Sequence, residues 1–550
     1  MRVTLCAINS KYVHSTLAVW YLKAAANENS QCTVVEGTIN EELEDIIKRI
    51  EKSAPDIVAF STYIWNKSYV MTIAERVKET TNAKILLGGP EVSYNAKDIL
   101  ESYPFVEYVI SGEGEEPFLK LCRNEALEKI EGLCYKKGED VVIKEPYVSK
   151  NDPPNPYTKE YLERLNGRIA YLETSRGCPY RCAFCLSGRC GGVRFFDLEQ
   201  SKKNIVLLAN SGARTVKFID RTFNADRKRA REIFSFIIGE YENTIPKGVC
   251  FHFEIEGELL DEETFEILKQ APVGLIQFEI GLQSFNEKTL EEINRRTDLK
   301  LLTRNIERVL SLGNIHTHID LIIGLPHEGI ESFKKSFDLA YALKPHMLQI
   351  GFLKLLHGSA LREQKKVQKC EFTDTPPYEI LSNEWLSRDE VTKLHFFEDV
   401  FEKMYNSRRF ALTCDYLSTL YESPFDMYFG LSEHVSDKQP KSLDEFTKEV
   451  FEYFGSMPFV DKNKLRDALA IDRLATNKMG ALPEFLKVKH RNLKKTLNIL
   501  EKNEWTKRPK NVKRAATPLL TENRIAYVDY DHCDYLTNRF LVKFTEIYDK

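Results

Sequence analysis

Arg176-Gly177-Cys178-Pro179-Tyr180-Arg181-Cys182-Ala183-Phe184-Cys185 is the stretch that decides the fold. It directly follows an apolar run, Arg168–Thr174, that reads as a β-strand. Iron–sulfur clusters are bound by cysteine thiolates, normally four. Three thiolates on one loop can hold three irons and leave the fourth iron open. We therefore predict Cys178, Cys182 and Cys185 as the metal ligands of a 4Fe–4S cluster.

A zinc site is the alternative for these three cysteines. Structural zinc is four-coordinate, and its ligands usually come as paired C-x-x-C half-sites. The chain has 12 cysteines, of which three are clustered and nine are scattered. Cys190 lies close enough in sequence to be a fourth ligand. The spacing favours the cluster, and zinc with Cys190 remains the alternative.

Length and composition limit the possibilities further. A chain of 550 residues exceeds one ordinary core, so two or three domains are expected. The net charge of −4 gives no general attraction to nucleic acid. We interpret the basic run Lys487–Lys495 as the solvated face of a helix. No stretch reaches the ~18–20 apolar residues of a membrane span, and the N-terminus lacks a signal peptide's pattern. We expect a cytoplasmic protein with no membrane or nucleic-acid partner.

The first 150 residues alternate short apolar strands with helical patterns, which predicts an α/β, doubly wound (Rossmann-like) parallel sheet. Ligands of such sheets bind at the carboxyl ends of the strands. The predicted strands are Val3–Ile8, Thr33–Glu36, Asp56–Thr62, Lys84–Leu87 and Val106–Ile110.

A proline-rich break at residues 151–156 starts a second domain, 151–370, in which the alternation resumes. Six strands predict a partial (β/α)6 TIM barrel, with reactive groups at the carboxyl ends: Arg168–Thr174, Thr215–Asp220, Val249–Glu256, Leu275–Gln283, His316–Gly324 and Met347–Leu356. Residues 371–550 predict a mainly helical third domain, with helices over Tyr378–Asn406, Ser442–Phe454 and Phe485–Asn503 and a closing strand pair, Arg524–Tyr530 and Phe540–Phe544.

The cysteine spacing, with the aromatic Phe184 before the last cysteine, resembles the radical S-adenosylmethionine (SAM) superfamily. The resemblance implies that the open iron binds the amino and carboxylate groups of SAM. It also implies that the reduced cluster cleaves SAM to a 5′-deoxyadenosyl radical, which abstracts hydrogen from a small-molecule substrate. Such an enzyme needs an electron donor such as flavodoxin or ferredoxin.

Several residues after the motif are candidates for SAM binding. Asp220 lies in an F-x-D-x-x-F stretch that resembles cobalamin-domain radical SAM proteins, where it would face the SAM amino group; a helix N-cap is its alternative. Glu254 and Glu256 could bind the ribose hydroxyls or pair with Lys or Arg. Arg295 or Arg296 could bind the SAM carboxylate.

Further matches follow along the predicted barrel. Gln283 and Ser284 lie in Ile-Gly-Leu-Gln-Ser-Phe-Asn, which resembles oxygen-independent coproporphyrinogen oxidase and its relatives. Gly324 would allow close approach of the adenosine of SAM, and Leu353 lies in a strand that could bind adenine through backbone hydrogen bonds.

The N-terminal domain resembles the cobalamin (B12)-binding domain fused to many radical SAM enzymes, through Pro55–Ser61, Leu87–Glu91 and Ser111–Glu115. The D-x-H-x-x-G histidine that would supply a lower cobalt ligand is absent, as is common in the fused family. Tyr63 and Trp65 could fill the volume of the corrin ring or stack on it, so the sequence leaves cobalamin open.

The same edge of the sheet carries three candidate substrate contacts, Tyr12, His14 and Trp65. His14 would contact a substrate or cofactor if the two domains dock as in relatives. Its alternative is a buried polar side chain that is simply hydrogen-bonded.

The whole layout, with Tyr378–Asn406 and the ending Tyr530-Asp531-His532, resembles a cobalamin-domain subgroup with an extra C-terminal domain. One activity implied by this resemblance is queuine lyase, in which radical chemistry cleaves a C–N bond of the queuine base without cobalamin. We adopt this as the working hypothesis. The alternatives are a cobalamin-dependent radical SAM methyltransferase and a non-catalytic cobalamin or metal sensor, which would not need the cluster and SAM motifs.

Overall fold

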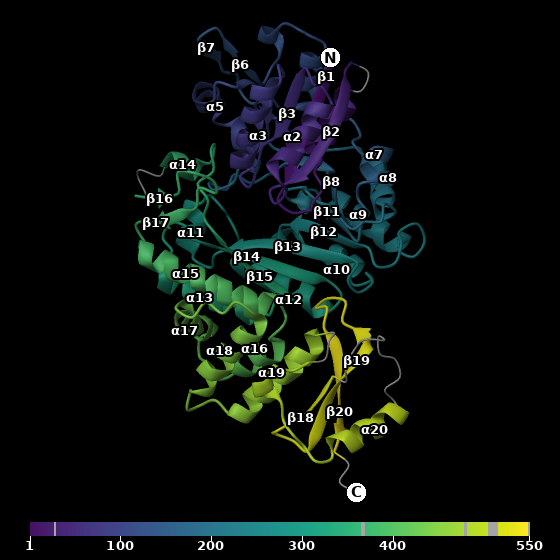
Figure 1. Cartoon of the computed structure of the whole chain (residues 1–550), viewed down its shortest axis with the longest axis vertical. Coiled ribbons are helices and arrows are strands. Elements are labelled where there is room, and N and C mark those ends of the chain that lie inside the picture. The colour runs from purple at the N-terminus through teal and green to yellow at the C-terminus, as the bar shows by residue number, and fades with distance from the viewer. Residues whose placement is uncertain (27–28, 365–368, 478–480, 504–514, 548–550) are drawn as a thin grey trace. The chain divides into compact units, whose positions relative to one another are not determined.

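The computed structural model describes residues 1–26, 29–364, 369–477, 481–503 and 515–547. Contacts divide the chain into two compact units (Figure 1). Unit 1 comprises Met1–Gly281, Lys288–Asn305 and Phe352–Glu384, and unit 2 comprises Leu282–Glu287, Ile306–Gly351 and Trp385–Lys550. Each unit is described by itself below.

The N-terminal part of unit 1 is a seven-stranded sheet of order β2-β1-β3-β4-β5-β6-β7. Its first five strands are parallel, as predicted, whereas β6 and β7 add an antiparallel edge that the sequence pattern did not reveal. The strands are β1 (Arg2–Asn9), β2 (Gln31–Thr38), β3 (Ile57–Ser61), β4 (Lys84–Gly88), β5 (Val106–Ile110), β6 (Leu133–Lys137) and β7 (Asp140–Val142).

The helices of this part cover the sheet because each has an apolar face. In α2, three isoleucines at helical spacing, Ile46, Ile47 and Ile50, are buried with α3 residues such as Ile73 against the sheet. Figure 1 shows both helices beside strands β1 to β3. The helices are α1 (Ala18–Ala26), α2 (Leu43–Lys52), α3 (Lys67–Thr80), α4 (Pro90–Ser93), α5 (Ala96–Ser102) and α6 (Glu115–Cys122).

The second part of unit 1 holds four adjacent parallel strands of the predicted barrel, β8, β11, β12 and most of β13. An aromatic layer packs these strands against helix α9: the ring of Phe253 lies 4.4 Å from that of Phe218 and 5.1 Å from that of Phe234 on α9. The elements are α7 (Lys159–Leu162), β8 (Ile169–Leu172), β9 (Ser175–Gly177), β10 (Val193–Phe195), α8 (Leu198–Ala209), β11 (Thr215–Phe218), α9 (Arg227–Glu240), β12 (Cys250–Ile255), α10 (Glu262–Leu268) and β13 (Ile276–Gln283).

The remaining strands of the alternation are β14 and β15, so six strands alternate with helices along the chain, as the partial barrel requires. This confirms the predicted α/β class. The elements are α11 (Glu287–Glu292), α12 (Leu299–Leu312), β14 (His316–Ile323), α13 (Ile330–Ala342), β15 (Met347–Phe352), α14 (Ala360–Gln364), β16 (Glu371–Phe372) and β17 (Ile380–Ser382).

The backbone of strand β8 is hydrogen-bonded by the loop that follows β1. The amide of Ile169 donates to the carbonyl of Val13 at 2.8 Å, and the hydroxyl of Ser15 donates to the carbonyl of Ile169 at 2.8 Å. An unpaired strand edge leaves N–H and C=O groups without partners, and this loop supplies them. A buried ion pair, Arg168 with Glu36 at 2.8 Å, joins the same two parts of unit 1.

The C-terminal part is mainly helical, as predicted, but two helix boundaries are wrong. The helix predicted over Tyr378–Asn406 begins at Arg388, where Ser387 and Glu390 form a capping box. The helix predicted over Phe485–Asn503 is α-helical only from Leu493. The elements are α15 (Arg388–Phe401), α16 (Ala411–Ser418), α17 (Pro424–Ser436), α18 (Leu443–Gly455), α19 (Lys462–Thr476), α20 (Leu493–Asn503), β18 (Ala516–Pro518), β19 (Arg524–Cys533) and β20 (Phe540–Glu546).

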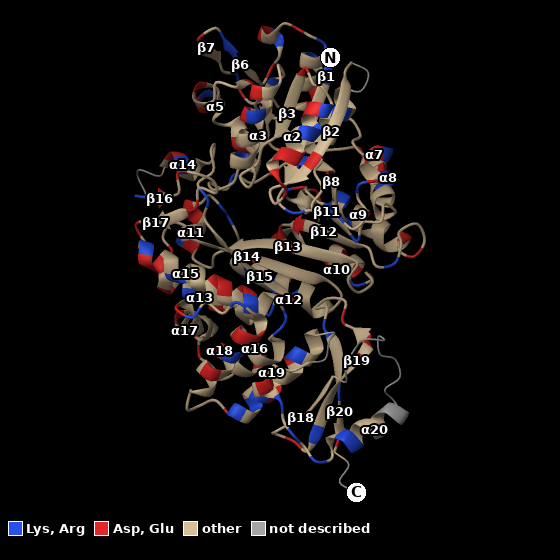
Figure 2. Ribbon diagram, in the orientation of Figure 1, with Lys and Arg blue, Asp and Glu red and all other residues tan. Residues whose placement is uncertain are grey.

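The basic run Lys487–Lys495 ends on α20. There Lys494 and Lys495 are exposed, while Leu497 and Leu500 are buried in a cluster with Tyr527. This is the arrangement of an amphipathic helix with a solvated basic face. Figure 2 shows Lys and Arg interspersed with Asp and Glu on other helices of this part.

Within the described ranges, no helix combines the length and apolar character that crossing a membrane would require.

Removing the charge of Glu36 should destabilise unit 1. Arg168 is buried and Glu36 is nearly so, with side chains 7% and 11% exposed, and an uncompensated buried charge costs about 3 kcal/mol or more. Glu36→Gln keeps the side-chain shape and leaves Arg168 uncompensated, so the thermal unfolding midpoint should fall by several degrees in calorimetry. An unchanged midpoint would show that the pair contributes little.

Candidate active site

The three predicted cluster cysteines lie on the loop between β9 and β10, and each sulfur contacts a polar group. Cys178 Sγ lies 3.3 Å from Thr222 Oγ1, the amide of Ser187 donates to Cys185 Sγ at 3.4 Å, and Arg295 Nη1 donates to Cys182 Sγ at 3.9 Å. Hydrogen bonds to the sulfurs are one of the ways a protein adjusts a cluster. The loop therefore presents its thiols in a polar environment.

Among the residues that the structure describes, no group of three or more His, Cys, Asp or Glu could hold a single metal ion. The thiolates of a cubane bind different irons, so their sulfurs need not converge as the ligands of one ion do. The side chain of Cys190, the fourth ligand in the zinc alternative, lies outside the described part. The cluster assignment therefore rests on the cysteine spacing and its place after β8.

Beside Cys182, Arg295 and Glu256 form a buried ion pair with an Nη2–Oε2 distance of 2.8 Å. Two atoms of this pair, Arg295 Nε and Glu256 Oε1, are buried without a hydrogen-bond partner. A buried donor or acceptor without a partner is costly, which points to a ligand that supplies one. A free donor and a free acceptor beside the cluster loop fit the carboxylate and ammonium of an amino acid, so these residues fit the methionine end of SAM.

Asp220 has a local role in the structure. Its carboxylate accepts hydrogen bonds from Thr174 N at 3.0 Å, Thr174 Oγ1 at 2.7 Å and Ser175 Oγ at 2.5 Å. Burial raises the pKa of Asp220 to about 6. The N-cap of the next α-helix is Asp226, so the N-cap alternative for Asp220 is wrong. Its contact with the SAM amino group stays a prediction, because the carboxylate already joins the ends of β8 and β11.

Glu254 belongs to a charged group near the carboxyl ends of strands β11 and β12. Lys217 Nζ lies 3.5 Å from Glu254 and 3.1 Å from Glu279, and Arg221 Nη1 lies 3.8 Å from Glu254. His252 Nε2 lies 2.8 Å from Glu279. The Lys and Arg pairing considered for Glu254 is therefore present. Lys217 and Arg221 were not identified from the sequence, although Lys217 lies within the second predicted strand and Arg221 directly follows it.

In unit 2, Gln283 is buried with a positive φ of 73°, and its Oε1 has no hydrogen-bond partner among the described residues. Its neighbour Ser284 donates to Glu328 Oε1 at 2.6 Å, and burial raises the pKa of Glu328 to about 7. Ser284 is therefore a buried structural contact. Gly324 has a φ of 91°, a conformation that favours glycine.

Two further predicted cofactor residues lie in unit 1. The carbonyl of Leu353 accepts from the amide of Ile380 at 2.9 Å, so this oxygen is already used. Phe184 is half-buried on the cluster loop. Their contacts with adenine stay predictions.

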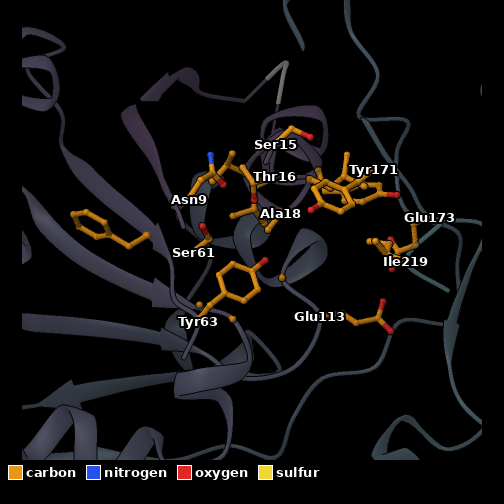
Figure 3. Close-up of a pocket in the computed structure, with 18 of the residues that line it drawn as sticks. Asn9, Ser15, Thr16, Ala18, Ser61, Tyr63, Glu113, Tyr171, Glu173 and Ile219 are labelled. Carbon is orange, nitrogen blue, oxygen red and sulfur yellow. The ribbon is translucent and has the colours of Figure 1, made fainter. Parts of the chain in front are cut away.

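A cavity of about 700 Å³ lies where the carboxyl ends of β1, β3, β4 and β5 face those of β8, β11 and β12 (Figure 3). This size is typical of a small-molecule or cofactor site. His14 lines it and its Nδ1 lies 2.8 Å from the hydroxyl of Tyr171. Burial lowers the pKa of His14, as do the charges of Lys11, Lys217 and Arg168. The imidazole is therefore neutral at pH 7.

Trp65 also lines this cavity. Its ring stacks on that of Tyr63, with the ring centroids 4.4 Å apart and an angle of 7° between the ring planes. Figure 3 shows Tyr63 reaching towards Thr16 and Ala18. Tyr12, in contrast, does not line the cavity and is 72% exposed. Two of the three predicted substrate contacts thus meet at one site.

The sequence left open whether a corrin ring could bind at this edge, and the residues there fit a large planar ligand. The cavity persists beside the Tyr63–Trp65 stack, so these rings line the edge without filling it. Gly88 at the end of β4 would place a Cβ in open space. The edge therefore combines space with an aromatic surface.

A second cavity, of about 1390 Å³, is lined by Cys182 and Cys185 together with the loops that follow β4 and β5. It shares Gly89, Gly112 and Glu113 with the first cavity. The cluster loop and the carboxyl edge of the N-terminal sheet therefore border the same space.

Comparison with protein families gives three matches along the chain. Residues 3–121 match the B12 binding domain, residues 172–340 match the Radical SAM superfamily, and residues 368–539 match a protein of unknown function, DUF4080.

Two curated relatives are methyltransferases. The chain is 24% identical over 447 residues to the 2-(S-pantetheinyl)-carbapenam-3-carboxylate methyltransferase of Streptantibioticus cattleyicolor, covering 74% of this chain and 62% of the relative. It is 26% identical over 346 residues to the cobalamin-dependent radical SAM methyltransferase TokK of Streptomyces tokunonensis, covering 58% and 50%. The chain thus spans less than two thirds of the length of either relative.

Among solved structures, the cobalamin-dependent SAM radical enzyme OxsB, with aqua-cobalamin and SAM bound, superposes with a TM-score of 0.60. The match covers 92% of this chain and 82% of OxsB at 14% identity. At that identity the likeness shows the fold alone.

Cys182→Ala should remove the iron–sulfur absorbance of the anaerobically reconstituted protein, because one of three ligands is lost. Cys190→Ala is the matched control and should keep the absorbance and the iron content. Full iron content in Cys182→Ala, or its loss in Cys190→Ala, would contradict the ligand assignment.

Asp220 should make stability pH-dependent. Its pKa is raised to about 6 from an ordinary 3.8, so the folded protein holds an extra proton between these values. The stabilisation by the neutral carboxyl is therefore complete below about pH 4 and is lost as the pH rises through about 6. Asp220→Asn should flatten this part of the thermal stability profile measured from pH 4 to pH 8. A variant profile parallel to the wild type would exclude Asp220 as the source.

Proposed function

The chain belongs to the radical SAM enzymes that carry a B12-binding domain, and from that premise we propose that it is a cobalamin-dependent methyltransferase acting on a small molecule. One observation carries the proposal. The carboxyl edge of the N-terminal sheet and the carboxyl ends of the core strands enclose a common cavity of about 700 Å³. This is the place where a cofactor of the first domain and a substrate held by the second would meet.

When bound, the cluster with SAM supplies radical chemistry and cobalamin supplies a methyl carrier. The protein's part is to hold and orient them. Cys178, Cys182 and Cys185 would hold the cluster. The free donor and acceptor of Arg295 and Glu256 support binding of SAM at its amino-acid end.

Other residues of the cavity would orient the substrate and restrict water. Lys217 lies between two carboxylates, and Arg221 lines the cavity with its Nη1 3.8 Å from Glu254. A substrate with an anionic group could pair with Arg221. The neutral imidazole of His14 could accept a hydrogen bond from Tyr171, which would fix that hydroxyl at the cavity wall.

The queuine lyase hypothesis finds no support in the two curated relatives described above, both of which are methyltransferases. The methyltransferase alternative fits them better, and cobalamin becomes an expected cofactor. One observation is equally compatible with a lyase, which is the second candidate. The Tyr63–Trp65 stack offers an aromatic surface on which a planar base could stack at the position expected for the corrin ring.

Corrinoid binding separates the two candidates. We expect the anaerobically reconstituted chain to retain hydroxocobalamin through gel filtration and, with SAM and a reductant, to form S-adenosylhomocysteine in a corrinoid-dependent manner. Trp65→Ala should weaken corrinoid retention, since a stacking surface is lost, while exposed Tyr535→Ala is the control. A corrinoid-free protein that converts queuine to 7-aminomethyl-7-deazaguanine would overturn the proposal in favour of the lyase.

A further inference from the structure

A half-buried group of five charged side chains joins the loop after β5 to the cluster loop. Arg176 and Arg194 come from β9 and β10, Glu113 and Glu115 come from the N-terminal domain, and Glu173 follows β8. All five side chains are between 12% and 19% exposed. Four of its members also line the first cavity, namely Glu113, Glu115, Glu173 and Arg176, but the proposed methyl transfer gives none of them a role. From the sequence, the Ser-Gly-Glu-Gly-Glu stretch was interpreted only as part of the cobalamin-type domain.

Arg176 uses three of its nitrogens on three different carboxylates. Nη1 donates to Glu113 at 2.9 Å, Nη2 donates to Glu115 at 2.6 Å, and Nε donates to Glu173 at 2.9 Å. Its guanidinium also lies 5.0 Å from the ring of Tyr21. A guanidinium that is hydrogen-bonded to three carboxylates and covered by an aromatic ring has little freedom to reorient.

Glu113 contacts both ends of the cluster loop. It accepts from Arg176 before the loop and from Arg194 Nη2 after it, at 2.7 Å. Arg176 and Arg194 are direct cross-strand partners in the antiparallel β9–β10 pair. The three cysteines therefore lie on a loop whose two ends are bound by one carboxylate of the other domain.

The backbone presents these carboxylates in a fixed way. Gly112 has a φ of 87°, and a Cβ there would lie 2.2 Å from the carbonyl oxygen of Tyr147. The amide of Glu113 donates to that same carbonyl at 2.8 Å. Burial acts to raise the pKa of Glu115, but the charge and hydrogen bonds of Arg176 keep it below its usual value. Glu115 is therefore ionised at neutral pH.

We propose that Glu113 and Glu115 are positioning residues for the iron–sulfur cluster, which act through Arg176 and Arg194 to hold the two ends of the cysteine loop. Loading and retention of the cluster then depend on the N-terminal domain, although that domain provides none of the three predicted ligands. Residues that orient metal ligands commonly change metal affinity about 10–100-fold when they are altered.

The test compares the full-length Glu113→Gln/Glu115→Gln variant with wild type after anaerobic reconstitution with ferrous iron and sulfide. Two readouts are used: the rate at which a chelator removes iron, and the electron paramagnetic resonance spectrum of the dithionite-reduced cluster. We expect loss of iron about tenfold faster or more and a changed spectrum. No SAM, cobalamin or substrate is present, so failure here is separate from failure of the proposed methyl transfer.

Glu36→Gln is the matched control, because it also breaks a buried ion pair between the N-terminal domain and the start of β8. It should lower thermal stability while iron loss and spectrum stay at wild-type values. Arg194→Lys keeps the positive charge but loses the planar guanidinium that donates to Glu113. This variant should also lose iron faster than wild type, and it tests the proposal if the double variant does not fold. Wild-type iron retention and a wild-type spectrum in the Glu113→Gln/Glu115→Gln and Arg194→Lys variants would overturn the proposal. Equally fast iron loss in Glu36→Gln would overturn it too.

Discussion

The arrangement of the site depends on a single cation, Arg176, surrounded by the carboxylates of Glu113, Glu115 and Glu173. Buried charges are tolerated only when they are paired and hydrogen-bonded, because desolvation of an unpaired ion costs several kcal/mol. Here three carboxylates accept hydrogen bonds from the guanidinium of Arg176, and Arg194 adds a second positive charge. The attraction between these charges thus opposes separation of the loop after β5 from the cluster loop. Glu113, a member of this group, lines both cavities.

The topology explains why so many charged side chains gather at this place. Parallel strands direct their carboxyl ends to one edge, and two such edges face each other within unit 1. Strand residues that alternate with the Phe layer, such as Lys217 and Glu254, point to the side opposite Phe218 and Phe253. The aromatic layer gives the strands their packing, while the other side is free to carry polar groups for chemistry.

The sequence predicted what depends on local pattern and missed what depends on pairing at long range. Continuous apolar runs located the parallel strands closely, for example β5 at Val106–Ile110, because both faces of such strands are buried. The cysteine spacing located the candidate cluster loop. Glu113 and Arg176 are 63 residues apart, and no periodicity links them. Asp220 was assigned to a ligand because its three donors, from Thr174 and Ser175, come from another strand end. The helix predicted from Tyr378 was wrong because the polar cap at Ser387, not the apolar pattern, decides where α15 begins.

The absent lower-ligand histidine and the Tyr63–Trp65 stack are weaker arguments against cobalamin than the sequence alone suggests. Histidine ligation adds one bond beneath the metal, whereas a corrin ring is held largely by contact area and shape along its edge and faces. The structure keeps that area: the cavity remains beside the Tyr63–Trp65 stack, and Gly88 leaves space. An edge that had lost its ligand would be expected to fill with side chains, because packed interiors leave few voids. A retained cavity at the position where two carboxyl edges meet is therefore better explained by an occupant, and the Tyr63–Trp65 stack offers a planar occupant a surface for stacking.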